Sequence, residues 1–196
     1  MNKEAWVKPA LKAKEFSKDH GKHGSRSAHR TKILNAETIK LLGDYFPPTK
    51  YKYSTEVRMP CSRGRTFSID ILVENKDNLS EKHIVLLKAV ERDFNKNSHN
   101  YANTQVGETL RIFANGEIYE DCSVIFIDWI PKKVPKKDKV EITKPRDQSK
   151  EISLLQAGID HYGHKNCKIL SAKIHYDGKQ ADGWKKIHRE LKELVA

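Results

Sequence analysis

The sequence predicts an α/β fold in which a mixed central β-sheet is flanked by helices. Two observations predict it. Short runs rich in aromatic and β-branched residues, typical of strands, alternate with amphipathic segments that are typical of helices. Two of the strand-like runs are apolar almost throughout, as expected for central strands that are covered on both faces. These two runs are 83–90 and 122–130.

The predicted elements follow one another as helix, strands, helix, strand, helix, strand and helix. Asn35 is the expected N-cap of the first helix, which the following Pro-Pro pair ends. In the second helix, Val106, Leu110 and Phe113 recur at spacings of four and three, which predicts its buried face. The expected helices are 35–45, 100–113, 151–162 and 184–195, and the expected strands are 51–59, 66–73, 83–90, 122–130 and 167–176.

Two basic, polar stretches interrupt this pattern. Residues 1–31 are expected to form a basic flexible arm, because the stretch 18–30 has almost no apolar content, and a short helix before that stretch stays open. Residues 32–196 are expected to form a single α/β domain, with a proline-broken basic loop at 131–150. The lysines of this loop either follow a phosphate backbone or form an ordinary solvated surface. They are Lys132, Lys133, Lys136 and Lys137.

The charge balance narrows the choice of partner. Lys and Arg number 37 against 26 Asp and Glu, which gives a formal net charge of +11 and predicts an anionic partner, most commonly nucleic acid. An anionic membrane surface and acidic proteins remain alternatives. No apolar run approaches the ~18 residues that a membrane span needs. The 3 cysteines form no CxxC pair, so neither a disulfide framework nor a cysteine zinc site is expected, and a reducing cytoplasm fits.

Asp70 and Lys88 are the strongest candidates for chemistry. They lie 18 residues apart, near the ends of two consecutive predicted strands, so an antiparallel pairing would bring both side chains into one cleft. Such charged groups are rarely buried unless they are paired or bind a metal. A carboxylate oxygen suits Mg²⁺, and the lysine could hold a phosphate and the attacking water. The alternative is a structural ion pair or two solvated strand ends.

This arrangement resembles the PD-(D/E)xK nuclease superfamily, and within it the type II restriction endonucleases. Ser68-Ile69-Asp70 is similar to the first half of the motif and Leu86-Leu87-Lys88-Ala89 to the second, over roughly residues 50–130. The resemblance implies a restriction-endonuclease-like core and Mg²⁺-dependent hydrolysis of double-stranded DNA at a specific site. It also implies a homodimer. Leu86 stands where the family has its second acid, so one metal-binding carboxylate is missing from the motif.

Some families of this superfamily carry the acid on the following helix, where this chain has Glu108. The resemblance therefore implies Asp70, Lys88 and Glu108 as the catalytic set, with Asp70 and Glu108 as the metal ligands. Glu56 and Glu91 are alternative second acids. The Asn-rich lead into the helix is similar to that of several restriction enzymes, and its amides could contact phosphates or base edges. The expected DNA-binding residues here are Asn97, Asn100, Asn103, Gln105 and Arg111.

Two other functions stay open. Leu86 favours a non-catalytic nucleic-acid-binding protein, in which Asp70 and Lys88 are structural. A nuclease of the same fold could instead act on a DNA structure, such as a junction or a repair intermediate, rather than on a specific sequence.

Overall fold

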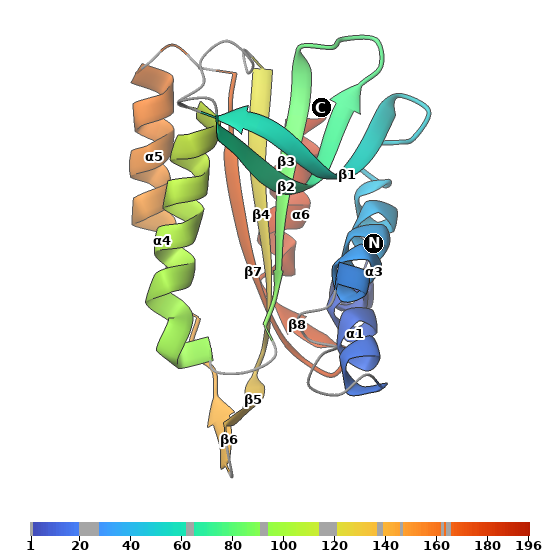
Figure 1. Ribbon diagram of the computed structural model, residues 1–196, viewed down its shortest axis with the longest axis vertical. Helices are drawn as coiled ribbons and strands as arrows, with labels where there is room; N and C mark the ends of the chain where they lie inside the picture. Colours follow the sequence, from blue (N-terminus) through green and yellow to red (C-terminus); the bar gives the residue numbers. More distant parts are fainter. Residues whose placement is uncertain are drawn as a thin grey trace.

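The computed structural model describes residues 2–19, 28–61, 65–90, 94–113, 121–136, 139–145, 147–161, 163 and 166–196. It confirms the α/β fold, with a 6-stranded mixed sheet between helices (Figure 1). The helices are α1 (Lys3–Asp19), α3 (Ala28–Leu42), α4 (Phe94–Phe113), α5 (Ser149–His161) and α6 (Trp184–Leu194). The strands are β1 (Tyr51–Cys61), β2 (Arg65–Asn75), β3 (Glu81–Ala89), β4 (Asp121–Pro131), β5 (Lys133–Lys136), β6 (Lys139–Ile142), β7 (Ile169–Asp177) and β8 (Gln180–Asp182).

The strand order in the main sheet is β1-β2-β3-β4-β7-β8. Strand β2 pairs antiparallel with both β1 and β3, whereas β3, β4 and β7 run parallel to one another. The strands that carry Asp70 and Lys88 are therefore antiparallel neighbours, which is the condition for both residues to reach one cleft. Parallel pairing also brings the carboxyl ends of β3 and β4 to the same edge of the sheet.

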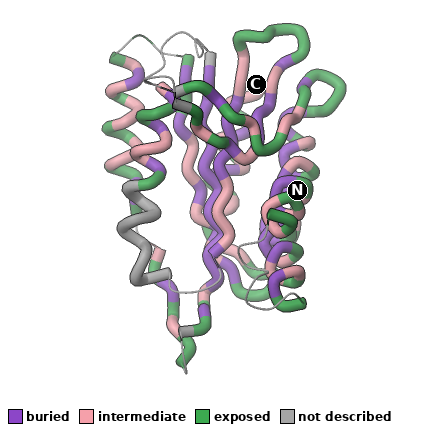
Figure 2. Tube along the Cα trace, viewed as in Figure 1, coloured by how far each residue is buried: buried purple, intermediate pink, exposed green. Residues whose placement is uncertain are grey.

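Helices cover both faces of the sheet. In Figure 1, α4 and α5 lie on one face, and α1, α3 and α6 lie on the other. The buried residues follow the middle strands (Figure 2). Strand β4 is buried on both faces, which explains its apolar sequence: Val124, Ile125, Phe126 and Ile127 are each at most 2% exposed. The helices in the described part of the chain include none that is long and apolar enough to cross a membrane.

The N-terminal region differs from the expected flexible arm. Residues 3–19 form helix α1, in which Trp6 is fully buried and its carbonyl accepts a 2.6 Å hydrogen bond from Trp129 Nε1. Small residues on the same face, Ala10 and Ala13, allow this lysine-rich helix to pack closely against the core. Helix α3 begins at Ala28, so Asn35 lies inside the helix and is not its N-cap. Residues 20–27 lie outside the described part.

The expected loop at 131–150 is also different in the structure. Strands β5 and β6 pair antiparallel as a two-stranded hairpin, in which Pro135 lies opposite Val140. A hairpin tolerates the proline because each strand has a free edge where a missing N–H breaks no ladder bond. The hairpin extends from the lower end of the sheet in Figure 1.

Candidate active site

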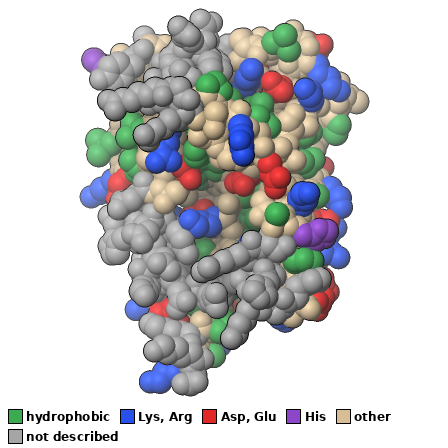
Figure 3. Space-filling model, viewed as in Figure 1, with side chains coloured by type: hydrophobic (Ala, Val, Ile, Leu, Met, Phe, Trp, Pro, Cys, Tyr) green, Lys and Arg blue, Asp and Glu red, His purple; other side chains and the backbone are tan. Residues whose placement is uncertain are grey.

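A cavity of about 200 Å³ lies between α4 and strands β2, β3 and β4. It brings together the three predicted catalytic residues, Asp70, Lys88 and Glu108, and adds a further carboxylate, Asp128. Acidic and basic side chains lie close together near the middle of the face seen in Figure 3. The cavity is lined by Ser68, Asp70, Leu86, Leu87, Lys88, Thr104, Gln105, Glu108, Phe126 and Asp128.

Asp70 lies where the β2–β3 ladder ends. The last paired residues of this ladder are Ile71 and Val85. Beyond this pair, the Leu87 N–H donates to the side chain of Asp70, at 2.7 Å from Oδ2. On the other side, Asn35 Nδ2 donates to the Asp70 backbone carbonyl at 3.3 Å. Burial raises the pKa of Asp70, against the lowering effect of the Leu87 N–H. The carboxylate is thus fixed in position and partly desolvated.

Lys88 reaches the cavity from β3. Its register partner on β4 is Asp128, and partners in a parallel pair project from the same face of the sheet. Burial lowers the pKa of the Lys88 ammonium, and three carboxylates oppose this, in decreasing order Asp128, Glu108 and Asp70. The next residue, Ala89, is held through its carbonyl by Arg30 Nη2 at 2.8 Å. Arg30 therefore supports the end of β3 from α3.

Glu108 comes from α4, whose buried face differs from the expected one. The buried residues are Gln105, Thr109 and Ile112, whereas Leu110 is 57% exposed. Polar groups can occupy this face because they bond within the protein; the Thr109 hydroxyl, for example, donates to the Gln105 carbonyl at 2.9 Å. The shift in face turns Glu108 towards the sheet. Burial raises its pKa to about 7, against the lowering effect of Lys88.

Asp128 is a site residue that the sequence analysis missed. It is 6% exposed, and its Oδ2 accepts a 2.8 Å hydrogen bond from Gln105 Nε2 on α4. Burial raises the pKa of Asp128 to about 6, although the Lys88 and Lys173 ammonium groups lower it. The signal was available: Asp128 is the one charged residue within the apolar run 122–130.

The structure does not place the two other candidate acids, Glu56 and Glu91, in the cavity. Glu56 is exposed, and it has a left-handed backbone with φ of 53° at the register position facing Asp70, where the β1–β2 ladder lacks a pair. Its charge still contributes to raising the Asp70 pKa. Glu91 lies outside the described residues. Leu86 lines the cavity with an apolar side chain.

The donor set fits a magnesium ion. Among the residues that the structure describes, no group of three or more His, Cys, Asp or Glu side chains is arranged to hold a metal. Mg²⁺ needs fewer protein ligands, since it is usually held by one or two carboxylates, waters and substrate phosphates. Asp70 and Glu108 provide two carboxylates at one cavity, and Gln105 Oε1 is a buried oxygen without a hydrogen-bond partner in the described part. All these donors are oxygens, the atoms that Mg²⁺ prefers.

The expected DNA-binding residues on α4 separate into two groups. Gln105 is 4% exposed and its amide bonds to Asp128, so the structure places it in the site and not on a DNA-contacting surface. Arg111 is exposed near the end of the helix. Asn97, Asn100 and Asn103 lie on α4, but their side chains are outside the described part.

The four lysines of the predicted loop also differ in position. Lys132 precedes the hairpin and its ammonium is 2.8 Å from an Asp182 carboxylate oxygen. Lys133 is exposed on β5. Lys136 ends β5, and its side chain is outside the described part, as is Lys137 altogether.

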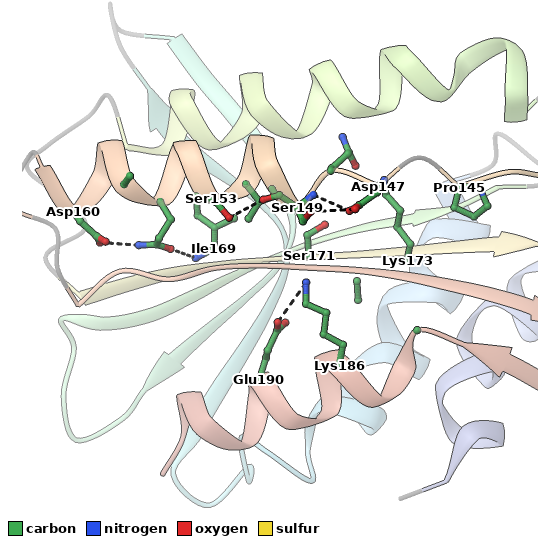
Figure 4. A pocket seen from close by; sticks show the side chains of 16 residues that line it. Pro145, Asp147, Ser149, Ser153, Asp160, Ile169, Ser171, Lys173, Lys186 and Glu190 are labelled. Carbon is green, nitrogen blue, oxygen red and sulfur yellow. Dashed lines mark hydrogen bonds and ion pairs between the residues drawn. The ribbon is translucent and has the colours of Figure 1, made fainter.

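A larger cavity, of about 670 Å³, lies between α5, β7 and α6 (Figure 4). Several of its polar side chains have partners within the protein: Lys186 pairs with Glu190 at 3.6 Å, and the Gln156 amide bonds the backbone of Ile169 and Cys167 at the start of β7. We place the candidate active site in the smaller cavity because the buried carboxylates and Lys88 converge there.

Comparisons with known proteins add little. No protein-family model matches the chain, and no curated protein matches it. One similar solved structure is described as a refined half-complex from the tetradecameric assembly of Thermococcus gammatolerans McrB AAA+ hexamers with bound McrC. The identity is 11% and the TM-score 0.41, and the match covers 84% of this chain and 33% of that chain. This chain therefore spans about a third of that protein, and so low a score supports no argument about fold or activity.

Proposed function

We propose that this protein is a metal-dependent endodeoxyribonuclease of the type II restriction class. The observation that carries the proposal is the convergence of Asp70, Lys88 and Glu108 on one cavity, although they come from three separate elements. Buried charged groups with shifted pKa values in a shared cavity are typical of functional sites. The sequence resemblance to PD-(D/E)xK nucleases supplies the reaction class.

The roles follow from the chemistry of each group. Asp70 and Glu108 would hold Mg²⁺, which would neutralise the charge that builds up on the phosphate. Lys88 donates hydrogen bonds to a phosphate oxygen and to the attacking water, orienting both. Asp128 balances the charge of Lys88 and, through Gln105, holds the turn of α4 that presents Glu108. The low exposure of these groups strengthens each of these interactions.

The net charge of +11 supports double-stranded DNA as the substrate. Cutting both strands of a symmetric site requires two active sites, so we propose a homodimer acting in the cytoplasm.

A cleavage assay tests the proposal directly. Supercoiled plasmid is incubated with the protein in Mg²⁺ or in EDTA. The proposal predicts discrete linear fragments in Mg²⁺ and none in EDTA. A smear in Mg²⁺ would indicate a nonspecific or structure-specific nuclease, and intact plasmid under all conditions would contradict the assignment as a nuclease.

One observation favours a second candidate, a non-catalytic nucleic-acid-binding protein. Leu86 lines the cavity at the position where the family has an acid. In that case Asp70, Lys88 and Asp128 form a buried charge network that stabilises the sheet. The protein would then bind duplex DNA in EDTA and leave it intact in Mg²⁺.

A further inference from the structure

The β5–β6 hairpin has a rigid base. The Thr143 hydroxyl, just after β6, donates to the Pro131 carbonyl at 2.6 Å and lies 2.8 Å from His175 Nε2 on β7. Lys132 is held twice, by its ion pair with Asp182 and by its N–H, which donates to the Tyr176 carbonyl at 2.6 Å. Contacts to β4, β7 and β8 therefore fix the direction in which the hairpin leaves the sheet.

One face of this hairpin is exposed and apolar. The register pairs Lys133 with Ile142 and Pro135 with Val140, so these four residues share a face. Val140 is 67% and Ile142 65% exposed, two of the five large apolar side chains that are most exposed in the described part of the chain. The opposite face carries Val134, which is 1% exposed and packs at the base. Packing in the protein interior thus accounts for an apolar residue at Val134, but not at Val140 or Ile142, which are exposed.

The charge of the hairpin favours a polyanion as its partner. Lys133 is exposed on the apolar face, and Lys139, the register partner of Lys136, is exposed on the opposite face. Glu141 is the one acid among the described hairpin residues. A ribbon with one apolar face and exposed lysines on both faces matches a DNA groove, where phosphates line the edges and thymine methyl groups lie on the floor.

The position of the hairpin relative to the candidate active site fits the same partner. Lys133, at the start of β5, lies five positions after Asp128 of the cavity. An extended chain of that length spans about 17 Å, or about five base pairs of B-DNA. A duplex with a phosphate at the cavity would therefore extend past the hairpin. The major groove, about 12 Å wide, admits a two-stranded ribbon.

We propose that the β5–β6 hairpin enters the major groove of duplex DNA about five base pairs from the phosphate at the cavity. Val140 and Ile142 contact base edges there, and Lys133 and Lys139 contact the flanking phosphates. This inference rests on the proposed function and adds to it the element that reads the DNA.

The test is duplex binding in EDTA, measured by fluorescence anisotropy with a labelled duplex of mixed sequence. The double variant Val140→Ser/Ile142→Ser should bind at least about tenfold more weakly than the wild type, because two apolar side chains no longer pack against the bases. The control Leu79→Ser/Leu154→Ser changes two equally exposed apolar residues outside the hairpin, 74% and 75% exposed, and should bind as the wild type does. Lys133→Ala/Lys139→Ala should flatten the slope of log K against log salt by about 0.9 for each phosphate that the variant leaves without a lysine.

Duplex binding by the Val140→Ser/Ile142→Ser variant at wild-type affinity would overturn the inference. The inference would also be overturned if this variant had a lower mass than the wild type in analytical ultracentrifugation while its duplex affinity stayed the same. The apolar face would then be a contact between two copies of this chain. The binding experiment in EDTA and the cleavage assay in Mg²⁺ test the hairpin contact and the proposed function separately. Hairpin-dependent binding without cleavage in Mg²⁺ rejects only the nuclease, whereas cleavage with hairpin-independent binding rejects only the groove contact.

Discussion

Lys88 and Asp128 lie directly opposite each other on the parallel strands β3 and β4, and both are directed into the cavity that holds Asp70 and Glu108. The Asp128 carboxylate acts to raise the pKa of Lys88, against the larger lowering effect of burial. Asp128 also accepts the Gln105 amide, which lies three residues before Glu108 on α4. One buried carboxylate thus connects the lysine to the helix that carries the second acid.

Lys88→Ala should abolish cleavage and leave duplex affinity within about tenfold of the wild type, because one phosphate interaction among many contributes little to binding. The same substitution should raise the activation free energy of cleavage much more, since Lys88 orients the water and stabilises the charge that develops in the transition state. Single-turnover cleavage and anisotropy measure the two effects separately. Lys82→Ala, on the same strand but paired with Glu74, is the matched control and should cleave normally. Wild-type cleavage by Lys88→Ala would remove the nuclease assignment.

Asp70→Asn and Glu108→Gln should each lose cleavage and also lose the rise in melting temperature that Mg²⁺ gives the wild type, because each removes one of two metal-binding carboxylates. Glu56→Gln, at the exposed position facing Asp70, should change neither quantity appreciably. Differential scanning fluorimetry with and without Mg²⁺ provides a readout that does not depend on turnover. The placement of the second acid on α4 would be wrong if Glu56→Gln, and not Glu108→Gln, removed the Mg²⁺ effect.

Asp128→Asn should lower kcat more than it raises KM, because the asparagine still accepts the Gln105 hydrogen bond but no longer balances the Lys88 charge. Without the largest opposing carboxylate, burial should lower the Lys88 pKa further, and the alkaline limb of the pH–rate profile should move to lower pH. Asp128→Ala should in addition destabilise the fold by about 1–3 kcal/mol, since it leaves the buried Gln105 amide without its acceptor. An unchanged alkaline limb in Asp128→Asn would show that Asp128 acts only in packing.

The metal-free protein should become less stable as pH rises. Burial raises the pKa of Glu108 to about 7 and of Asp128 to about 6, so the folded state keeps protons that the unfolded state releases above the ordinary carboxylate range. The unfolded state then binds fewer protons than the folded state, and stability falls as pH increases up to about 7. Melting temperatures across this range should fall for the wild type and more gently for Glu108→Gln. Added Mg²⁺ should stabilise the protein more at high than at low pH, because the carboxylates must lose their protons to bind it.

Much of the candidate site was predictable from the sequence, and the features that were not predicted have physical causes. Asp70 and Lys88 stood out because charge is costly within strand-like runs, and the antiparallel pairing of their strands supports placing them in one site. Asp128 carried the same signal, but the apolar character of its strand masked it. Helix α1 was expected only as an open alternative of a short helix, because its buried face consists of Trp6 and small residues among many lysines, a pattern that resembles a solvated segment.

The hairpin and the buried face of α4 could not be predicted from local patterns. Hairpin β5–β6 contains Pro135 and several lysines, which indicate a loop, and its base is anchored to β4 and β7 through Thr143. On α4, the buried Gln105 donates to Asp128 on β4, and the buried Thr109 donates to the Gln105 carbonyl one turn earlier on the same helix. The partner on β4 is visible only in the folded chain. Hydrophobic periodicity therefore predicted that α4 is a helix, but not which of its faces packs against the sheet.

Leu86 offers a test of the site by rescue. It is 6% exposed, lines the cavity and lies on the same side of β3 as Lys88, two residues away. A carboxylate there would take the place that the PD-(D/E)xK nucleases, which the sequence motif resembles, use for their second acid. Leu86→Glu in the Glu108→Gln background should therefore restore part of the cleavage that Glu108→Gln loses, together with stabilisation by Mg²⁺.

The matched control for this rescue is Leu86→Gln in the same background, which has nearly the same shape and no charge, and it should stay inactive. Both double variants bury a polar group in place of leucine and should melt lower than Glu108→Gln without metal. Added Mg²⁺ should recover stability only where the glutamate is present, because only a carboxylate compensates the charge of the ion. If Leu86→Glu/Glu108→Gln folds and gains stability from Mg²⁺ but cleaves no better than Glu108→Gln, Glu108 contributes more than a metal-binding charge. If it folds without any response to Mg²⁺, a carboxylate at position 86 does not replace the one that Glu108→Gln removes.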